Sequence, residues 1–159
     1  MAIEEAITRL IPAISKVLVV GDKHPYLVAL ITLQQDMDAP GQLTGLALDV
    51  SPSCTTVAEA MDDPAWQRYI TSAIERVNAD GTVCRNNCYK VQKYMIFDGD
   101  FTLAGDDLTP ALKYKRFAIQ HKYARQVNDM YAASTKESGS VFQNWPVAYV
   151  HWRDHGAKI

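Results

Sequence analysis

The sequence predicts an α+β fold, in which a small β-sheet contains a β-hairpin and is flanked by helices. Two β-branched and leucine-rich runs, residues 17–20 and 26–33, lie on either side of a turn-forming sequence at 21–25, a pattern typical of a hairpin. A third apolar run at 91–97 has the composition of a further strand. Neither arm of the hairpin alternates cleanly between apolar and polar residues, so we expect both faces of the sheet to be covered.

Helical periodicity indicates the segments that would cover the sheet. Apolar residues spaced i, i+3, i+4 and i+7 predict a short N-terminal helix, which Pro12 limits. A stronger helix is predicted to start at Pro64, since Asp63 can cap its first turn and Gly81 can end it. A last amphipathic helix is predicted over residues 117–131. The three apolar stripes are Ile3, Ala6, Ile7 and Leu10; Trp66, Ile70, Ala73, Ile74 and Val77; and Ile119, Tyr123, Val127, Met130 and Tyr131.

Length and composition restrict the possible classes of protein. With 159 residues the chain has the size of one domain, and its net charge of -2 does not favour a nucleic-acid or anionic-membrane surface. The longest apolar run, 26–33, is far shorter than the roughly 18–20 residues that span a bilayer. The acidic N-terminus lacks the profile of a signal peptide, and the odd count of three cysteines favours reduced thiols. We therefore expect a cytoplasmic protein.

A polar loop at residues 107–116 carries the strongest functional signal. Lys113, Lys115 and Arg116 place three cations within four positions, between the third strand-like run and the last helix. Three charges so close together cannot all be buried without partners, so the loop must face water or bind an anion. Composition alone leaves both interpretations open.

The order of residues in this loop is informative. The loop reads Asp107-Leu-Thr-Pro-Ala-Leu-Lys-Tyr-Lys-Arg116, and Lys122-Tyr123 and Tyr131 follow it. This order resembles the lysine loop near the C-terminus of bubblegum-like long-chain fatty-acid–CoA ligases, which are AMP-forming adenylating enzymes. The departures are Asp107, where the family usually has Glu, and Ala111, where the usual Thr would provide a hydroxyl. The resemblance extends to the Gly-Asp-Lys turn at 21–23.

This resemblance implies that residues 1–133 have the fold of the small C-terminal lid domain of adenylate-forming enzymes. A linker and an aromatic-rich tail of unassigned role would follow at 134–159. The implied activity is ATP-dependent formation of an acyl-adenylate, followed by thioester formation with CoA. By motif position, Lys113 would be the catalytic adenylation lysine, touching the acyl carboxylate and the oxygen that bridges ribose and phosphate. Thr109, Lys115 and Arg116 would bind the nucleotide or CoA, or, in the case of Lys115 and Arg116, anchor the loop or contact the partner domain.

The same resemblance implies that most of the active site lies on other polypeptide. In this family a larger N-terminal domain binds ATP, Mg²⁺ and the fatty acid, and it carries a Ser/Thr/Gly-rich phosphate loop that this sequence lacks. We therefore expect the chain to bind no metal, to need that domain as its partner, and to be catalytically incomplete alone. The whole enzyme would act in lipid metabolism, in the cytoplasm or at the periphery of membranes.

Two other functions stay open at this point. The domain could be a non-catalytic module that holds a nucleotide or the phosphate of CoA on its basic loop. It could also be a protein-interaction domain whose basic loop is only solvated. No nucleic-acid partner is expected.

Overall fold

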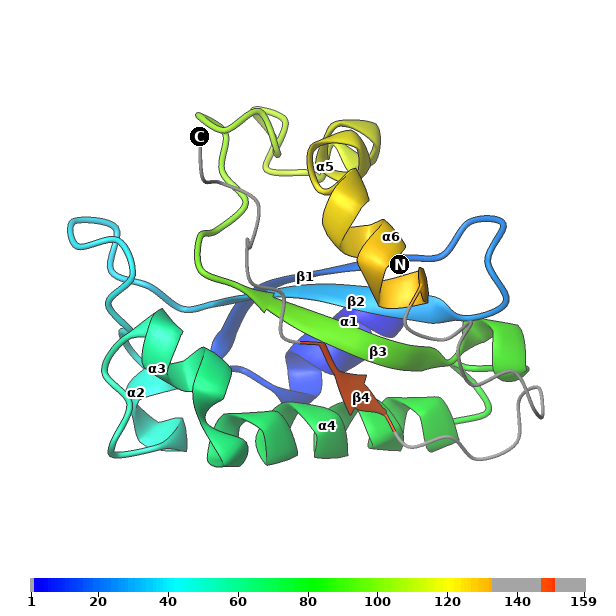
Figure 1. Cartoon of the computed structure of the whole chain (residues 1–159), viewed down its shortest axis with the longest axis horizontal. Helices are drawn as coiled ribbons and strands as arrows, with labels where there is room; N and C mark the ends of the chain where they lie inside the picture. The colour runs from blue at the N-terminus through cyan, green and yellow to red at the C-terminus, as the bar shows by residue number, and fades with distance from the viewer. Residues whose placement is uncertain (1, 133–146, 151–159) are drawn as a thin grey trace.

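The structure, a computed structural model, describes residues 2–132 and 147–150 and consists of a sheet between two layers of helices (Figure 1). The sheet has the strand order β1-β2-β3-β4. Its β1 and β2 are antiparallel, while β2 pairs with β3, and β3 with β4, in parallel. The strands are β1 (Ile14–Val20), β2 (Leu27–Leu33), β3 (Val91–Phe97) and β4 (Ala148–Tyr149). The predicted α+β class, the hairpin and the third strand are all confirmed.

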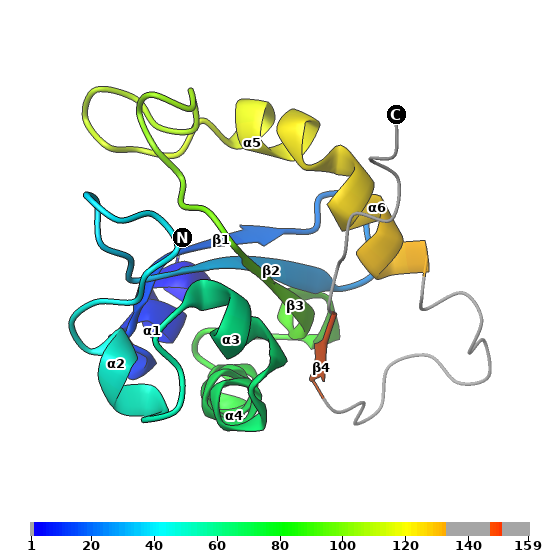
Figure 2. The ribbon, with the colours of Figure 1, turned by 60° about the vertical axis from the view of Figure 1, so that its left-hand side comes forward.

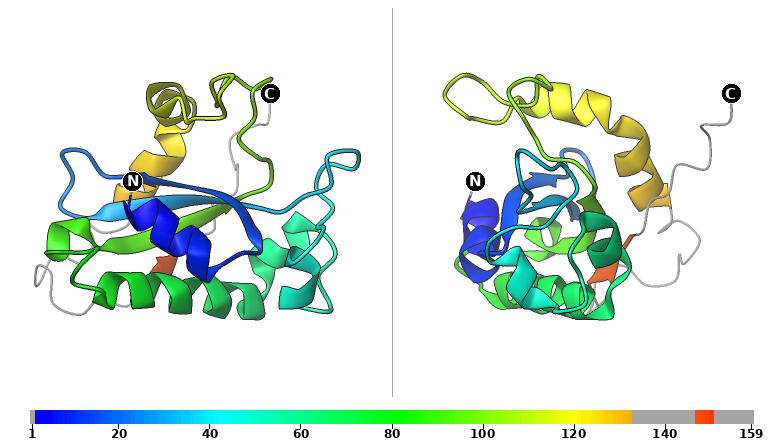
Figure 3. Two further views of the ribbon diagram at one scale, coloured as in Figure 1. Left: turned by 180° about the vertical axis from the view of Figure 1, so that it is seen from behind. Right: turned by 90° about the vertical axis from the view of Figure 1, so that its left-hand side faces the viewer.

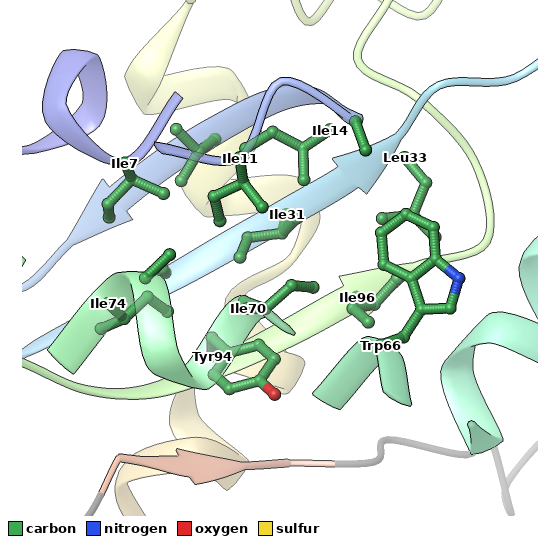
Figure 4. Close-up of a cluster of buried hydrophobic side chains, with 14 of the residues drawn as sticks. Ile7, Ile11, Ile14, Ile31, Leu33, Trp66, Ile70, Ile74, Tyr94 and Ile96 are labelled. Carbon is green, nitrogen blue, oxygen red and sulfur yellow. The ribbon is translucent and has the colours of Figure 1, made fainter. Parts of the chain in front are cut away.

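Helices from the first half of the chain cover one face of the sheet. Figure 3 shows α1 (Ala2–Leu10) lying across this face, with α4 (Pro64–Ala79) running beneath it. Two short helices, α2 (Ala47–Val50) and α3 (Val57–Asp62), close one end of this layer. The side chains that fill the space between helices and sheet include Ile7, Ile11, Ile31, Trp66, Ile70, Ile74, Tyr94 and Ile96 (Figure 4).

The opposite face is covered by the last helices, α5 (Arg116–Lys122) and α6 (Ala124–Ala132). Strand residues alternate between the two cores: Val17 and Val19 face the α1 and α4 layer, whereas Leu18 and Val20 face the α5 and α6 layer. All four are buried. This arrangement confirms that both faces are covered, and it explains why the strand sequences show continuous apolar runs instead of alternation.

The predicted boundaries of α4 are confirmed by its caps. The Asp63 carboxylate accepts a hydrogen bond from the Ala65 amide at 2.8 Å, and Pro64 occupies the first helical turn. The helix ends at Ala79, two residues before Gly81. Local sequence therefore fixes both ends of the helix that contributes the largest buried side chain of the core, Trp66.

The predicted single helix at 117–131 was wrong, because the structure breaks it at Tyr123. This residue lies between α5 and α6 with φ −109° and ψ 21°, outside helical geometry. Its ring contacts Phe97 of β3, with 4.6 Å between the ring centroids. The break bends the chain so that α5 and α6 follow the sheet (Figure 2), which buries Ile119 and Met130 in the same core.

The C-terminal tail contributes one described segment to the sheet. Ala148 and Tyr149 pair with Lys93 and Tyr94 at the edge of β3, and Val147 is buried in the core beside them. No sequence pattern predicted a strand in this segment. The remainder of the predicted linker and tail, 134–146 and 151–159, lies outside the described residues, so the boundary at residue 133 stays a prediction. Among the helices that the structure describes, none is both long and apolar enough to cross a bilayer.

Tyr131 attaches α6 to the hairpin. Its hydroxyl donates a hydrogen bond to the Tyr26 carbonyl at 2.8 Å, and its ring stacks on His24 with centroids 3.7 Å apart. His24, predicted to be a turn residue, is exposed despite this stacking contact. Burial raises the pKa of Tyr131, since the phenolate would lose its hydration.

We expect Tyr131→Phe to reduce the loss of stability at alkaline pH. A tyrosine in the unfolded chain ionises near pH 10, below the raised pKa in the folded protein. The contribution of Tyr131 is therefore complete below about pH 10 and is lost as pH rises toward the folded pKa. Urea unfolding at about pH 8 and pH 11 measures the difference. Tyr89→Phe, at an exposed tyrosine, is the control, and equal pH dependence in both variants would contradict this assignment.

Candidate active-site loop

The lysine loop, residues 107–116, is a small hairpin whose tip projects beyond the end of α5 (Figure 2). The Lys115 amide donates a hydrogen bond to the Asp107 carbonyl at 2.8 Å, and Leu108 forms an antiparallel bridge with Tyr114. The Thr109 amide donates to the Lys113 carbonyl at 2.8 Å. These bonds close the base of the loop and place Lys113 beside its tip.

The tip is a tight turn that Thr109 stabilises. Its hydroxyl accepts a hydrogen bond from the Lys113 amide at 3.2 Å, and its carbonyl accepts one from the Leu112 amide at 2.8 Å. Leu112 has φ 61°, a left-handed conformation that is uncommon for a residue with a Cβ atom. Its side chain is 70% exposed. A strained backbone maintained by local hydrogen bonds is a feature of positioned functional loops.

The Lys113 side chain is exposed at this tip. Among residues 2–132 and 147–150, its ammonium forms neither an ion pair nor a hydrogen bond. It lies with Leu112 along a shallow groove of about 770 Å³, whose opposite wall is formed by α1 residues such as Thr8 and Arg9. The cation is therefore available to a group from outside the described part of the chain.

Arg116 attaches the C-terminal end of the loop to the first helix. Its guanidinium donates to both carboxylate oxygens of Glu4, at 3.0 and 2.7 Å. The Glu4 side chain is only 7% exposed, compared with 36% for Arg116. Glu4 also accepts a hydrogen bond from the Val19 amide of β1 at 2.8 Å. The hydrogen bonds to Glu4 raise the pKa of Arg116, which is charged at any physiological pH.

A second ion pair fixes the other end of the loop. The Asp107 carboxylate, almost fully buried, accepts a hydrogen bond from Lys122 at 3.0 Å and from the Thr102 amide at 3.1 Å. This interaction with Asp107 raises the pKa of Lys122. The substitution of the family's usual Glu by Asp107 therefore retains a carboxylate that anchors the loop to α5.

Lys115 and Tyr114 lie on either side of the loop. The Lys115 ammonium pairs with Asp106 on the surface. Tyr114 is partly buried, with its ring edge against Phe101 and a hydrogen bond to the Val17 backbone. Burial raises the pKa of Tyr114. Tyr114 thus packs the base of the loop, as predicted from its position, while Lys115 points to a local carboxylate.

The structure brings Glu4 into the site, which sequence reasoning did not place there. Glu4 precedes Arg116 by 112 residues, so no local pattern could pair them. The available signal was a carboxylate within the apolar stripe of α1, between Ile3 and Ile7. A buried acidic residue needs a cationic partner, and the only cation-rich segment predicted for the site was the lysine loop.

Known proteins of similar sequence include long-chain-fatty-acid–CoA ligases. No protein-family model matches the chain. The chain is 31% identical over 143 residues to the long-chain-fatty-acid–CoA ligase ACSBG2 of Homo sapiens, which covers 81% of this chain and 21% of that protein. It is 31% identical over 149 residues to ACSBG1 of Bos taurus, covering 87% and 20% respectively. The chain thus spans about a fifth of the length of the ligases that it matches.

Two solved structures share the fold. The A-PCP didomain of carboxylic acid reductase from Segniliparus rugosus, solved in complex with AMP, superposes with a TM-score of 0.60 at 18% identity and covers 84% of this chain and 16% of that one. The adenylation domain of the carboxylate reductase from Mycobacterium chelonae gives a TM-score of 0.59 at 19% identity, covering 82% and 17%.

Fold, loop and sequence similarity together define a domain of an adenylate-forming enzyme. Within that class, the chain is similar in sequence to the long-chain fatty-acid–CoA ligases ACSBG1 and ACSBG2 over about a fifth of their length.

We expect Arg116→Leu to lower the free energy of unfolding by about 1–3 kcal/mol, because the Glu4 carboxylate would remain buried without this cation. Adding Glu4→Gln should recover part of the loss, since the uncompensated charge is then removed. The control, Lys115→Leu, breaks an exposed pair and should cost less than about 1 kcal/mol. Urea unfolding of the unchanged protein, both single variants, the double variant and the Lys115→Leu control tests the pair, and strictly additive effects of Arg116→Leu and Glu4→Gln would contradict the coupling.

Proposed function

We propose that this chain is the C-terminal lid domain of an AMP-forming long-chain fatty-acid–CoA ligase, and that Lys113 is its adenylation lysine. The observation that carries the proposal is the state of the lysine loop. Both of its ends are held by buried carboxylates, Asp107 and Glu4, yet Lys113 beside its tip is exposed and makes no ion pair among the described residues. Such a loop presents one cation to a separate surface.

The proposed chemistry needs a cation of this kind. In the first half-reaction a fatty-acid carboxylate attacks the α-phosphorus of ATP, so that an acyl–phosphate bond forms and pyrophosphate leaves. The reaction brings one anion onto a more highly charged anion, and a fixed positive charge lowers the barrier as negative charge builds on the transferred group. Lys113 would supply this charge, contacting the carboxylate and the oxygen that bridges ribose and phosphate. In the second half-reaction the CoA thiol displaces AMP.

We assign Thr109, Lys115 and Arg116 to the support of Lys113 in this proposal. Thr109 caps the turn, Lys115 pairs with Asp106, and Arg116 pairs with Glu4. A cation that already pairs with a carboxylate of its own domain would first have to break that pair to contact ATP or CoA. Direct cofactor binding by Lys115 and Arg116 is therefore less favoured than their predicted role as anchors of the loop.

ATP, Mg²⁺ and the fatty acid would be bound mainly by an N-terminal domain outside this chain. Within the described residues, no group of three or more His, Cys, Asp or Glu side chains could hold a metal ion. The chain also spans only about a fifth of its relatives. We infer that the domain alone is catalytically incomplete and that the whole enzyme serves lipid metabolism, in the cytoplasm or at membrane surfaces.

The purified chain should show no fatty-acid-dependent exchange of pyrophosphate into ATP, because substrate positioning provides a large part of the rate and the proposal assigns that positioning to the N-terminal domain. Isothermal titration with AMP and with CoA distinguishes the alternative of a binding module. Clear exchange by the lone chain would refute the inference of incompleteness, and tight nucleotide binding without activity in any context would favour the non-catalytic function.

Lys113→Ala should abolish adenylate formation when the chain is fused to the N-terminal portion of human ACSBG2. We expect a loss of about 10²–10³-fold in the adenylation rate, the size seen when one charge-stabilising group is removed from a transition state. Thioester formation from supplied acyl-adenylate should be retained. Arg85→Ala, which removes an exposed cation outside the lysine loop, is the matched control. Equal loss of both half-reactions in Lys113→Ala would contradict the role proposed for Lys113.

A further inference from the structure

We infer that Glu4 is a positioning residue for Lys113: through Arg116 it fixes where the tip of the lysine loop lies. This inference rests on the proposed function for its catalytic meaning, but the mechanical link can be tested without it. Glu4 binds the Val19 amide and the Arg116 guanidinium, so its effect on Lys113 would pass through Arg116.

Glu4 is itself fixed. Its side chain is buried, and one of its carboxylate oxygens accepts hydrogen bonds from both the Val19 amide and Arg116. Val19 lies in β1, the outer strand of the described sheet, and its amide points away from β2. The carboxylate thus joins the helix to the rigid sheet and presents a fixed acceptor to the loop.

Arg116 has one strong partner, Glu4, and one weaker partner, the Val19 carbonyl. Its two hydrogen bonds to Glu4 are near ideal in length, whereas its contact with the Val19 carbonyl is 3.5 Å long. The guanidinium is already about one-third exposed. Without the Glu4 charge it would gain more by turning into water than by remaining over the β1 edge.

Arg116 is close in sequence to the tip of the lysine loop. Arg116 is the first residue of α5 and follows Lys113 by three positions. The other end of the loop is held independently by Asp107 and Lys122. A short loop fixed at both ends has few conformations, whereas a loop released at one end can rotate about the other. Loss of the Glu4 contact should therefore move Lys113 without unfolding the core.

Glu4→Gln is the decisive variant because it conserves size and can still accept the Val19 amide, but removes the charge and one acceptor of the bidentate pair. Glu5→Gln makes the same chemical change on the next residue, whose side chain is exposed. The pair of variants separates the specific contact with Arg116 from a general change in the electrostatic field near Lys113. If Glu4→Gln does not fold, Glu4→Asp, which keeps the charge but shortens its reach, replaces it.

Hydrogen exchange of the 159-residue chain tests the mechanical link. In Glu4→Gln, the loop amides of Leu112, Lys113 and Lys115 should exchange at least about tenfold faster, while amides of β3 keep their rates. Glu5→Gln should match the unchanged protein. Unchanged exchange in the loop of Glu4→Gln, or an equal acceleration throughout β3, would overturn the inference, since the first shows no link and the second shows only global destabilisation.

The fusion with the ACSBG2 portion tests the catalytic consequence. Glu4→Gln should lower kcat for adenylation by about tenfold or more, because small displacements of a catalytic group are costly, while the KM for ATP and the thioester step are retained. If Lys113→Ala is inactive but Glu4→Gln matches Glu5→Gln, the positioning role is overturned. If Lys113→Ala is fully active, the proposed function fails, and the exchange result still decides whether Glu4 holds the loop.

Discussion

The structure depends on β2 being buried on both faces. Ala29, Ile31 and Leu33 face one core, and Val28 and Leu30 face the other. A strand covered on both sides requires a helical layer on each side, and the chain provides these from its two halves. It also leaves no room for a polar group without a partner, so any polar residue in β2 must be satisfied by a specific contact.

Thr32 is that polar residue, and its contact leads to the functional loop. Its buried hydroxyl donates to Asp100 at 2.6 Å and accepts from the Lys16 amide at 3.1 Å. Asp100 also binds Ser15 and the Lys16 ammonium. The chain leaving β3 is therefore tied to the sheet within three residues of the strand end, which fixes the starting point of the segment that carries the lysine loop.

Three carboxylates hold this segment in succession: Asp100 at its start, Asp107 at the base of the lysine loop and Glu4 at its end. Each pairs with one cation: Asp100 with Lys16 of β1, Asp107 with Lys122 of α5, and Glu4 with Arg116. Of the three cations that the loop sequence places together, Lys115 and Arg116 are paired, and Lys113 is the one exposed without a pair among the described residues. The proposed ligase chemistry requires this division, in which Lys115 and Arg116 anchor the loop and Lys113 remains available to the substrates.

The sequence by itself determined the α+β class, the hairpin, the third strand, both ends of α4 and the membership in the adenylate-forming enzymes. The structural features rest on periodicity, turn residues and caps, which act over a few neighbouring residues, whereas the membership rests on the resemblance of the lysine loop to a known family. Only the tertiary structure decided the break at Tyr123, the addition of β4 at the sheet edge and the pairing of Glu4 with Arg116. These depend on contacts between residues far apart in the chain, where packing against the sheet and the cost of a buried charge outweigh local preference.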